Sequence, residues 1–350
     1  MKKKILIVTY HDGINYGAFL QVYSLQQYLI ENNYNVHILN YKSYKHTILE
    51  YFYLLKTKNL SLFFNTLNKI VKFRILQKKS LKLTERYYRI PKNNKLNYDY
   101  IIYGSDEIWN FKNGLIGLDL IYFGNKIKGK KISYAPSFGN INFNNNIPQT
   151  IINLLKDFKI SVRDMNSFNV IMKNLDIEPE IVLDPTFLIQ NHLSDYISNI
   201  KLTEKYILIY MTQQLSSRRW EEILNYASIN NLKIISVGYK HKLASINLIN
   251  TCPIDFILLI KNAEIILTNM FHGFILSLQN EKKVHLFFDE YRKNKLGFYL
   301  DYFNLKHLII SEHETIAENI IQKNIDYIKL NEIIKKQLNS SKEFLNKYLI

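Results

Sequence analysis

The chain has 350 residues, 47% of them hydrophobic, and a formal net charge of +16 at pH 7; this length is enough for two domains, each with its own core. No stretch of about 18 uncharged apolar residues occurs, so no membrane-spanning helix is predicted. The apolar run after the basic N-terminus is too short for a secretory signal, and the single cysteine, Cys252, excludes an internal disulfide framework and fits a reducing cytoplasm.

Predicted strands and helices alternate through the first half of the sequence. A strand at 4–9, a glycine-bracketed loop at 11–17, a helix at 18–31 and a strand at 35–41 form a βαβ opening, which favours a mostly parallel sheet. Beyond a helical segment at 42–92, the predicted strands are 98–103, 131–136, 160–162 and 180–183. The predicted helices among them are 151–158 and one that begins at Asp164.

The second half repeats this alternation. Its predicted strands are 206–211, 233–237, 264–268 and 284–288, and its predicted helices are 218–229, 253–262, 273–279 and 331–347. The stretch 188–202 lacks clear periodicity and is the predicted domain boundary. We therefore expect an N-terminal domain at 1–190 with a basic helical insertion at 42–92, a C-terminal domain at 200–325, and a helix at 326–350 for which packing on the N-terminal domain is one option.

These elements predict an α/β protein made of two doubly wound Rossmann-like domains that face each other across a cleft. Ligands of such folds bind at the carboxyl ends of the strands. Polar residues that directly follow a predicted strand are therefore the first candidates for a functional site.

The segment 42–92 is strongly basic and also rich in aromatic and aliphatic residues. It holds 13 Lys or Arg and two acids, a net charge of +11. Contact with an anionic membrane surface and plain solvated helix faces explain this pattern equally well. Nucleic acid, the other common anionic partner, explains it less well, and we predict no nucleic-acid partner.

The stretch 265–274 is the most informative part of the chain. It predicts a buried strand, a sharp turn, His272, Gly273 and the start of a helix. An imidazole at this place can exchange protons near neutral pH, beside a helix N-terminus that attracts anions. The alternative is a structural histidine without a chemical role.

Two loops in the N-terminal half carry polar residues that suit a sugar. The loop at 11–17 places Asp12, Asn15 and Tyr16 between glycines that let the backbone approach a ligand; an ordinary strand-to-helix turn is the alternative. The loop that follows the strand at 98–103 combines Asp106, Glu107 and Trp109, which could bind sugar hydroxyls and stack on a sugar ring. Asp106 could instead be a helix N-cap.

Arg163 lies where a predicted strand meets a predicted helix. Its planar guanidinium matches a phosphate or carboxylate, and a surface ion pair with Asp164 is the alternative. The chain has no H-E-x-x-H, CxxC or Asp-x-Asp pattern, no Walker loop and no G-x-G-x-x-G. We therefore predict no metal site and no cofactor.

Six segments, taken in their order and spacing, resemble the polysaccharide pyruvyl transferase family. They are Asn15–Leu25, Gly104–Asn110, Ser133–Gly139, Ser161–Asp164, Val182–Thr186 and Thr268–Gly273. The resemblance implies a GT-B-like fold and the transfer of a pyruvyl group from phosphoenolpyruvate to a sugar of a surface polysaccharide or its lipid-linked precursor. The product would be a pyruvate ketal, made in the cytoplasm or peripherally at the inner face of the membrane.

The resemblance also implies roles for individual residues. His272 would be the catalytic acid, and Asp106, or less directly Asp12, would accept a proton from the acceptor. Phosphoenolpyruvate would be bound by Arg163, Phe271, Gly273 and Lys293. The acceptor sugar or lipid-linked oligosaccharide would be bound by Asp12, Asn15, Tyr16, Glu107 and Trp109.

One departure from the family pattern concerns the anion. Some relatives carry an arginine two residues before the histidine, where this chain has Met270. Arg292, Lys293 and Lys295 are candidate replacements. Two other functions stay open at this point: a GT-B glycosyltransferase that uses a nucleotide sugar, and a non-catalytic basic module that binds nucleic acid or an assembly partner.

Overall fold

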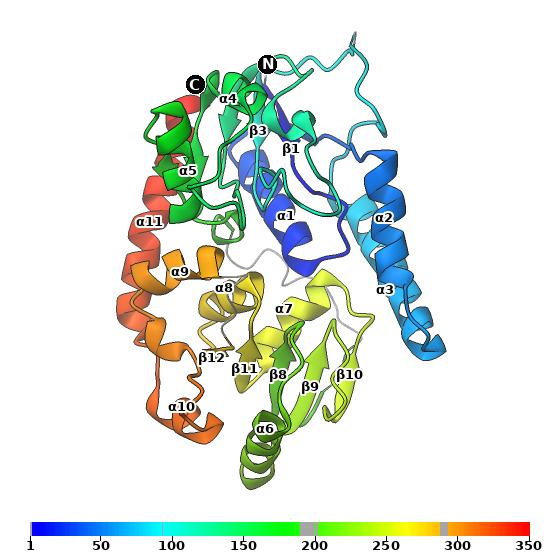
Figure 1. The fold of residues 1–350 in the computed structure, drawn as a ribbon, viewed down its shortest axis with the longest axis vertical. Coiled ribbons are helices and arrows are strands. Elements are labelled where there is room, and N and C mark those ends of the chain that lie inside the picture. Colours follow the sequence, from blue (N-terminus) through cyan, green and yellow to red (C-terminus); the bar gives the residue numbers. More distant parts are fainter. Residues whose placement is uncertain (1, 93, 190–199, 201, 288–292) are drawn as a thin grey trace. The chain divides into compact units, whose positions relative to one another are not determined.

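The chain forms two compact units, each described here by itself (Figure 1). The computed structural model describes residues 2–92, 94–189, 200, 202–287 and 293–350. Unit 1 comprises Met1–Thr57, Arg74–Ile189 and Lys335–Ile350, and unit 2 comprises Lys58–Phe73 and Gln190–Ile334.

Unit 1 is built on a five-stranded parallel sheet in the order β2-β1-β3-β4-β5. Its strands are β1 (Lys4–Val8), β2 (Asn35–Ile38), β3 (Tyr100–Tyr103), β4 (Lys130–Ser133) and β5 (Phe158–Lys159), with a small parallel pair of β6 (Ser161–Val162) and β7 (Glu180–Ile181). Its helices include α1 (Tyr16–Glu31), α2 (Tyr44–Leu55), α4 (Gln149–Leu155) and α5 (Met165–Leu175). The central strands β1 and β3 are almost continuously apolar and buried, as expected for a parallel sheet covered on both faces.

Unit 2 repeats the design with the order β10-β9-β8-β11-β12, again parallel throughout. Its strands are β8 (Tyr206–Tyr210), β9 (Lys233–Val237), β10 (Ile246–Leu248), β11 (Ile265–Thr268) and β12 (Lys283–Leu286). Its helices include α6 (Ser217–Ile229), α7 (Pro253–Asn262), α8 (Phe271–Gln279), α9 (Lys293–Tyr302) and α10 (Ile316–Gln322). The predicted α/β class with parallel sheets is therefore confirmed.

Two long helices contribute residues to both units. Helix α3 (Leu60–Ser80) belongs to unit 2 up to Phe73 and to unit 1 from Arg74, and α11 (Tyr327–Tyr348) passes from unit 2 to unit 1 at Lys335. The end of α11 is tied to unit 1 by hydrogen bonds that reach the strand region: Leu183 N–H donates to Ser341 Oγ (2.9 Å), and Gln337 Nε2 donates to the carbonyl of Ile181 (2.7 Å). None of the helices in the described ranges has the length and apolarity needed to cross a membrane.

The structure differs from the sequence expectation where elements are short. The predicted helix at 151–158 ends at Leu155, because the chain turns and Phe158 enters the sheet as β5, where its ring lies 4.8 Å from that of Tyr103. Strand β10 has only three residues, too few to show the alternation of side chains by which a strand is predicted from sequence. Helices α1 and α8 each begin two residues earlier than predicted, so His272 lies inside the first turn of α8.

His285, on β12, is an unusual core residue. Its side chain is fully buried, and within the described part of the chain neither ring nitrogen has a hydrogen-bond partner. Burial, with smaller contributions from the nearby positive charges of Lys283, Lys323 and His307, lowers the pKa of His285 from 6.5 to about 3. His285 is therefore neutral in the folded protein at any pH near neutrality.

This burial makes stability depend on pH. Because the folded pKa lies below the unfolded value, the unfolded chain takes up the proton first, and His285 destabilises the fold progressively as the pH falls from about 6.5 towards 3. His285→Leu should remove up to about 1.4 kcal/mol of acid-induced destabilisation per pH unit in that window. Denaturant titrations at pH 7 and 5 measure this. The exposed His313, replaced by Ala, is the control, and equal pH dependence in all three proteins would contradict the assignment.

Candidate functional site

Four of the sequence-predicted residues directly follow the carboxyl ends of strands, three in unit 1 and one in unit 2. In unit 1 the loops after β1, β3 and β6 carry Asp12, Asp106 and Arg163, and in unit 2 the turn after β11 carries His272. This placement follows from parallel pairing, because parallel strands all end at one edge of their sheet.

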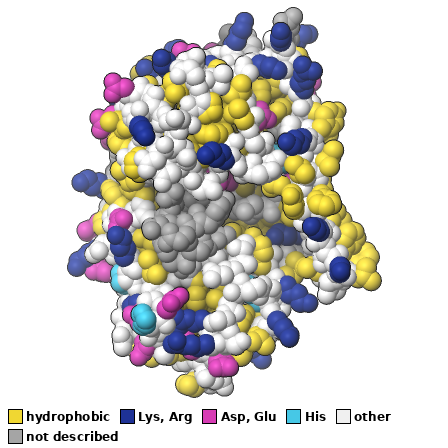
Figure 2. All heavy atoms as spheres, viewed as in Figure 1, with side chains coloured by type: hydrophobic (Ala, Val, Ile, Leu, Met, Phe, Trp, Pro, Cys, Tyr) yellow, Lys and Arg dark blue, Asp and Glu magenta, His cyan; other side chains and the backbone are white. Residues whose placement is uncertain are grey.

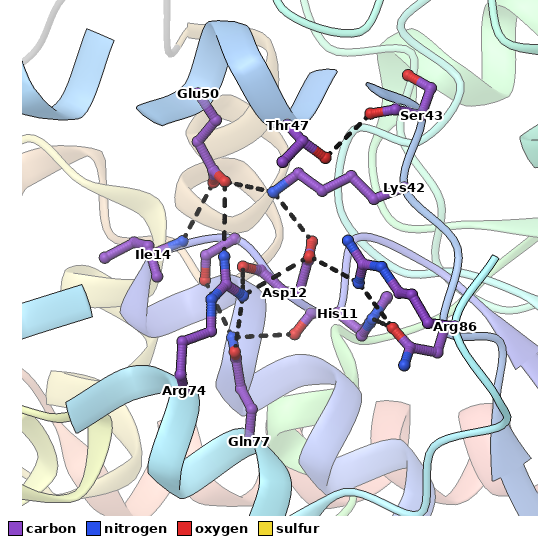
Figure 3. Close-up of polar contacts among 12 residues, drawn as sticks. His11, Asp12, Ile14, Lys42, Ser43, Thr47, Glu50, Arg74, Gln77 and Arg86 are labelled. Atoms are coloured by element: carbon purple, nitrogen blue, oxygen red, sulfur yellow. Dashed lines mark hydrogen bonds and ion pairs between the residues drawn. The ribbon is translucent and has the colours of Figure 1, made fainter. Parts of the chain in front are cut away.

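A buried cluster of charges surrounds Asp12 (Figure 3). Lys42 Nζ lies 3.3 Å from Asp12 Oδ1, and Arg86 and Arg74 approach Asp12 Oδ2 to 3.2 Å and 3.6 Å. Arg74 also donates to the backbone carbonyl of Asp12 (2.6 Å). Three cations from the basic segment therefore point inward to one carboxylate.

Glu50 on α2 completes this cluster. It pairs with Lys42, whose side chain is almost fully buried, and lies 3.8 Å from Arg74. The Ile14 N–H donates to Glu50 Oε1 (3.4 Å), which ties α2 to the loop that precedes α1. The cluster thus anchors part of the basic segment to the strand-end loop of β1.

These neighbours decide the chemistry of Asp12. Burial alone would raise its pKa, but electrostatic interactions with His11, Lys42, Arg74 and Arg86 outweigh burial and hold the pKa well below its ordinary value. A carboxylate so strongly stabilised as the anion is a weak proton acceptor. The low pKa argues against Asp12 as the residue that takes a proton from the acceptor, which stays a prediction, and its contacts are those of a structural anchor.

The other residues of the loop at 11–17 also have structural roles. Asn15 is the N-cap of α1, and its side chain accepts from the Ala18 N–H (3.1 Å). Tyr16 begins the helix and is buried. The ordinary strand-to-helix turn, which the sequence left open as an alternative, describes their positions in this structure better than contact with an acceptor does.

The three candidate residues of the loop at 104–110 lie in different environments. Trp109 is fully buried, donates from Nε1 to the carbonyl of Tyr122 (3.1 Å) and packs 5.4 Å from the ring of Phe138. Glu107 is buried and accepts from Asn110 Nδ2 (2.9 Å). Both side chains are engaged inside unit 1 in this structure, and their predicted contacts with the acceptor stay predictions. Asp106 keeps 22% of its side chain exposed and begins no helix, which excludes the N-cap alternative.

The buried side chain of Arg163 bridges two carboxylates. It donates to Asp184 Oδ2 (2.8 Å) and to Asp106 Oδ1 (3.2 Å), and its side chain is 1% exposed. Asp164 does not pair with it at the surface as the alternative supposed, but caps α5 by accepting from the Ser167 N–H (2.7 Å). Two carboxylates already pair with the guanidinium, which argues against a direct grip of Arg163 on a further dianion; its role towards the donor stays a prediction.

His272 lies in the first turn of α8, not in the turn before the helix as the sequence predicted. It is the second residue of α8, where the helix dipole favours a nearby anion, and about 9% of its surface is exposed. Its ring packs edge-on to Phe271 at 5.0 Å, and Phe271 packs edge-on to Tyr299 at 5.1 Å. The ring of Phe271, itself packed on Tyr299, thus orients the imidazole.

Gly273 allows α8 to start this close to the sheet. A Cβ at this position would lie 2.5 Å from Thr268 Oγ1 and 2.7 Å from Tyr210 Cδ1. Any larger residue would push the first turn, and His272 with it, away from the ends of β8 and β11. Met270 is the N-cap and brings no charge.

The candidate replacement cations after β12 cannot be placed. Arg292 lies outside the described residues, as do the side chains of Lys293 and Lys295. The described residues contain no group of histidines, cysteines and acids that could hold a metal ion. A pocket of about 260 Å³ in unit 1, lined among others by Tyr41, Arg89 and Asp119, includes none of the predicted site residues.

The sequence reasoning missed that Lys69 differs from the other cations of its segment. It lies on α3, is almost fully buried and contacts the rings of Phe73 and Tyr239. The signal was present only as helical spacing, because Asn65, Lys69 and Phe73 repeat every four residues on one face of α3.

Of the comparisons with known proteins, the family model shows the family and the solved structures show the fold. The family model described as polysaccharide pyruvyl transferase matches residues 15–287. No curated protein matches the chain. Among solved structures, UDP-GlcNAc 2-epimerase from Neisseria meningitidis bound to UDP-GlcNAc is 14% identical with a TM-score of 0.51, covering 99% of this chain and 100% of that one. Arabidopsis thaliana UGT89C1 complexed with UDP-L-rhamnose is 11% identical with a TM-score of 0.53, covering 99% and 98%. These likenesses show the GT-B fold.

The charge cluster predicts that Asp12 stabilises the folded protein. Asp12→Asn leaves Lys42, Arg74 and Arg86 with too little negative charge inside unit 1, and breaking a buried pair of this kind costs about 3–5 kcal/mol. Denaturant titration should show a loss of that size. Asp157→Asn, an exposed acid of the same unit, is the control and should change stability by less than about 0.5 kcal/mol. A neutral effect of Asp12→Asn would contradict the anchor role.

Proposed function

The chain belongs to the polysaccharide pyruvyl transferase family, and from that premise we propose that it transfers a pyruvyl group from phosphoenolpyruvate to a sugar of a surface polysaccharide or of its lipid-linked precursor. The product is a ketal that bridges two hydroxyls of the sugar. The observation that carries this proposal is His272, an imidazole in the first turn of a helix at the carboxyl edge of a parallel sheet.

The proposed pyruvyl transfer needs a general acid beside the anionic phosphoenolpyruvate. Protonation of the methylene carbon of phosphoenolpyruvate makes C2 electrophilic, a sugar hydroxyl attacks C2, phosphate leaves with the C–O bond electrons, and a second hydroxyl closes the ketal. An imidazolium at a helix start supplies the proton where the helix dipole attracts the negatively charged donor. Phe271 and Gly273 support this role by orienting the ring and by letting α8 approach the sheet.

Asp106 is the candidate acceptor for the proton of the sugar hydroxyl. It is the partly exposed carboxylate of its loop, and Arg163 holds its Oδ1 at 3.2 Å, which fixes the direction of the carboxylate. Arg163 then acts as a positioning residue that orients Asp106, and Asp184 on its other side neutralises the remaining charge. This assignment replaces the direct grip on the donor that the sequence suggested for Arg163.

We further propose that the basic segment holds the enzyme on the inner face of an anionic membrane, where lipid-linked acceptors lie. On α2 the side chains of Tyr44, Ile48 and Phe52 repeat every four residues, and all three are exposed, Ile48 by 68%. The exposed Lys45 and Lys56 border this stripe. Figure 2 shows hydrophobic side chains interspersed with Lys and Arg on the side of the view where α2 lies.

Helix α3 carries a second stripe of the same kind. Leu60, Phe64, Val71 and Ile75 fall on one line of the helix surface and are each more than half exposed, while Lys72, Lys78 and Lys79 are exposed beside them. Apolar side chains ringed by lysines suit the boundary between acyl chains and anionic headgroups. Exposed apolar stripes of this length are costly on a helix that only faces water.

The first test concerns His272. His272→Ala should lower the rate of phosphate release from phosphoenolpyruvate, measured with an acceptor glycan present, by about 10²- to 10⁴-fold, because general acid help is lost. His313→Ala, an exposed histidine of unit 2, is the control and should keep the wild-type rate. Retained turnover in His272→Ala would remove this residue from the mechanism.

A ligand-binding comparison separates the two enzyme classes. A pyruvyl transferase should be stabilised in a thermal shift assay by phosphoenolpyruvate, whereas a GT-B glycosyltransferase should be stabilised by UDP or GDP. Stabilisation by a nucleoside diphosphate with indifference to phosphoenolpyruvate would favour the glycosyltransferase.

The second test concerns the membrane. Co-sedimentation with vesicles that contain phosphatidylglycerol should bind the wild-type protein and weaken with salt. The double change Ile48→Ser and Phe52→Ser should weaken binding about tenfold or more, because two apolar side chains no longer enter the interface. Ile229→Ser, a change at an equally exposed isoleucine on α6, is the control. Binding that is indifferent to anionic lipid would leave α2 and α3 as plain solvated helices.

A further inference from the structure

Lys69 is set apart from the other lysines of α3 by its burial. It is 8% exposed, whereas Lys72, Lys78 and Lys79 on the same helix are exposed. Lysine is among the residues least often buried, because an ammonium loses its hydration inside a protein.

The surroundings of Lys69 are aromatic and lie within unit 2. Its Nζ is 5.8 Å from the centre of the Tyr239 ring and 5.9 Å from that of Phe73. One turn earlier, Asn65 Oδ1 accepts from Asn250 Nδ2 (3.2 Å). These contacts hold the inward face of α3 against the segments that follow β9 and β10.

The place is the same sheet edge that carries His272. Tyr239 follows β9, its ring lies 6.0 Å from that of Tyr210 at the end of β8, and Tyr210 is the residue that a Cβ on Gly273 would touch. In the sheet order, β8 separates β9 from β11. Neighbouring strands are about 4.8 Å apart, so the ends of β9 and β11 are separated by about 10 Å, a span that one small anionic ligand with its attached group can cover.

We propose that Lys69 binds an anionic group of a ligand at the carboxyl edge of the unit 2 sheet, in the same site as His272. The group is a carboxylate or phosphate, contributed either by phosphoenolpyruvate or by the diphosphate of a lipid-linked acceptor. Lys69 supplies a positive charge that Met270, at the start of α8, does not. This inference rests on the proposed function and adds a binding residue to it.

Burial of the ammonium gives the proposal a pH signature. Desolvation lowers the pKa of Lys69 from 10.5 to about 8, so the free protein begins to lose this charge in mildly alkaline solution. A bound anion stabilises the ammonium, and by linkage the affinity for that anion falls as the pH rises above about 8. An exposed lysine would show no such change in this range.

The test is isothermal titration of the full-length protein with phosphoenolpyruvate and, separately, with inorganic diphosphate, at pH 7 and pH 9. Wild-type protein should bind at least one of the two probes and lose about tenfold in affinity at pH 9. Lys69→Met should bind that probe about 10- to 100-fold more weakly at pH 7, as expected for a lost charge-assisted contact. Lys69→Arg, which stays charged, should retain binding and lose the part of the pH dependence that Lys69 contributes.

Lys72→Met is the matched control, because it removes a lysine from the exposed side of the same helix and should behave as wild type. The probe that Lys69→Met affects identifies the source of the anion, the donor or the acceptor carrier. Wild-type binding that Lys69→Met leaves unchanged would overturn the role of Lys69 and spare the proposed function. Failure of the wild-type protein to bind either probe would overturn both.

Discussion

Parallel pairing of the strands in each unit is the constraint on which the rest of the molecule depends. It directs every strand-end loop of a unit to one edge, so residues that are far apart in the sequence become neighbours there. In unit 1 this brings Ser105, Asp106, Arg163 and Asp184 into one hydrogen-bonded group. In unit 2 it places the ends of β8, β9 and β11 side by side, with His272 in the helix that follows β11.

The lysines and arginines of the basic segment 42–92 have different environments in the fold. Lys42, Arg74 and Arg86 turn inward and hold the carboxylate of Asp12, whereas Lys69 turns to the sheet edge of unit 2. Lysines such as Lys45 and Lys72 stay exposed beside apolar stripes. The net charge of the segment therefore serves as an internal anchor, a candidate ligand contact and a candidate membrane surface at once.

Charge pairing also separates supporting residues from reacting ones. A carboxylate or guanidinium enclosed by opposite charges keeps its ionisation state and has little capacity left for a ligand. This applies to Asp12 and Arg163, whose charged groups are paired with opposite charges in this structure. Asp106 and His272 retain some exposure at their sheet edges, which is the condition for contact with a substrate.

The sequence by itself determined the fold class, the βα alternation and the family, because local periodicity and strand-end motifs are short-range properties of the chain. It also identified Arg163, Asp106 and Trp109 as notable, since their residue types stand out at strand ends. Only the tertiary structure decided which of them are enclosed: Trp109 enters the core and Arg163 meets Asp184 because segments more than ten residues apart pack together. Burial and pairing depend on such long-range contacts, and so the inward turn of Lys42 within the basic segment had no counterpart in the sequence pattern, while that of Lys69 was indicated only by helical spacing.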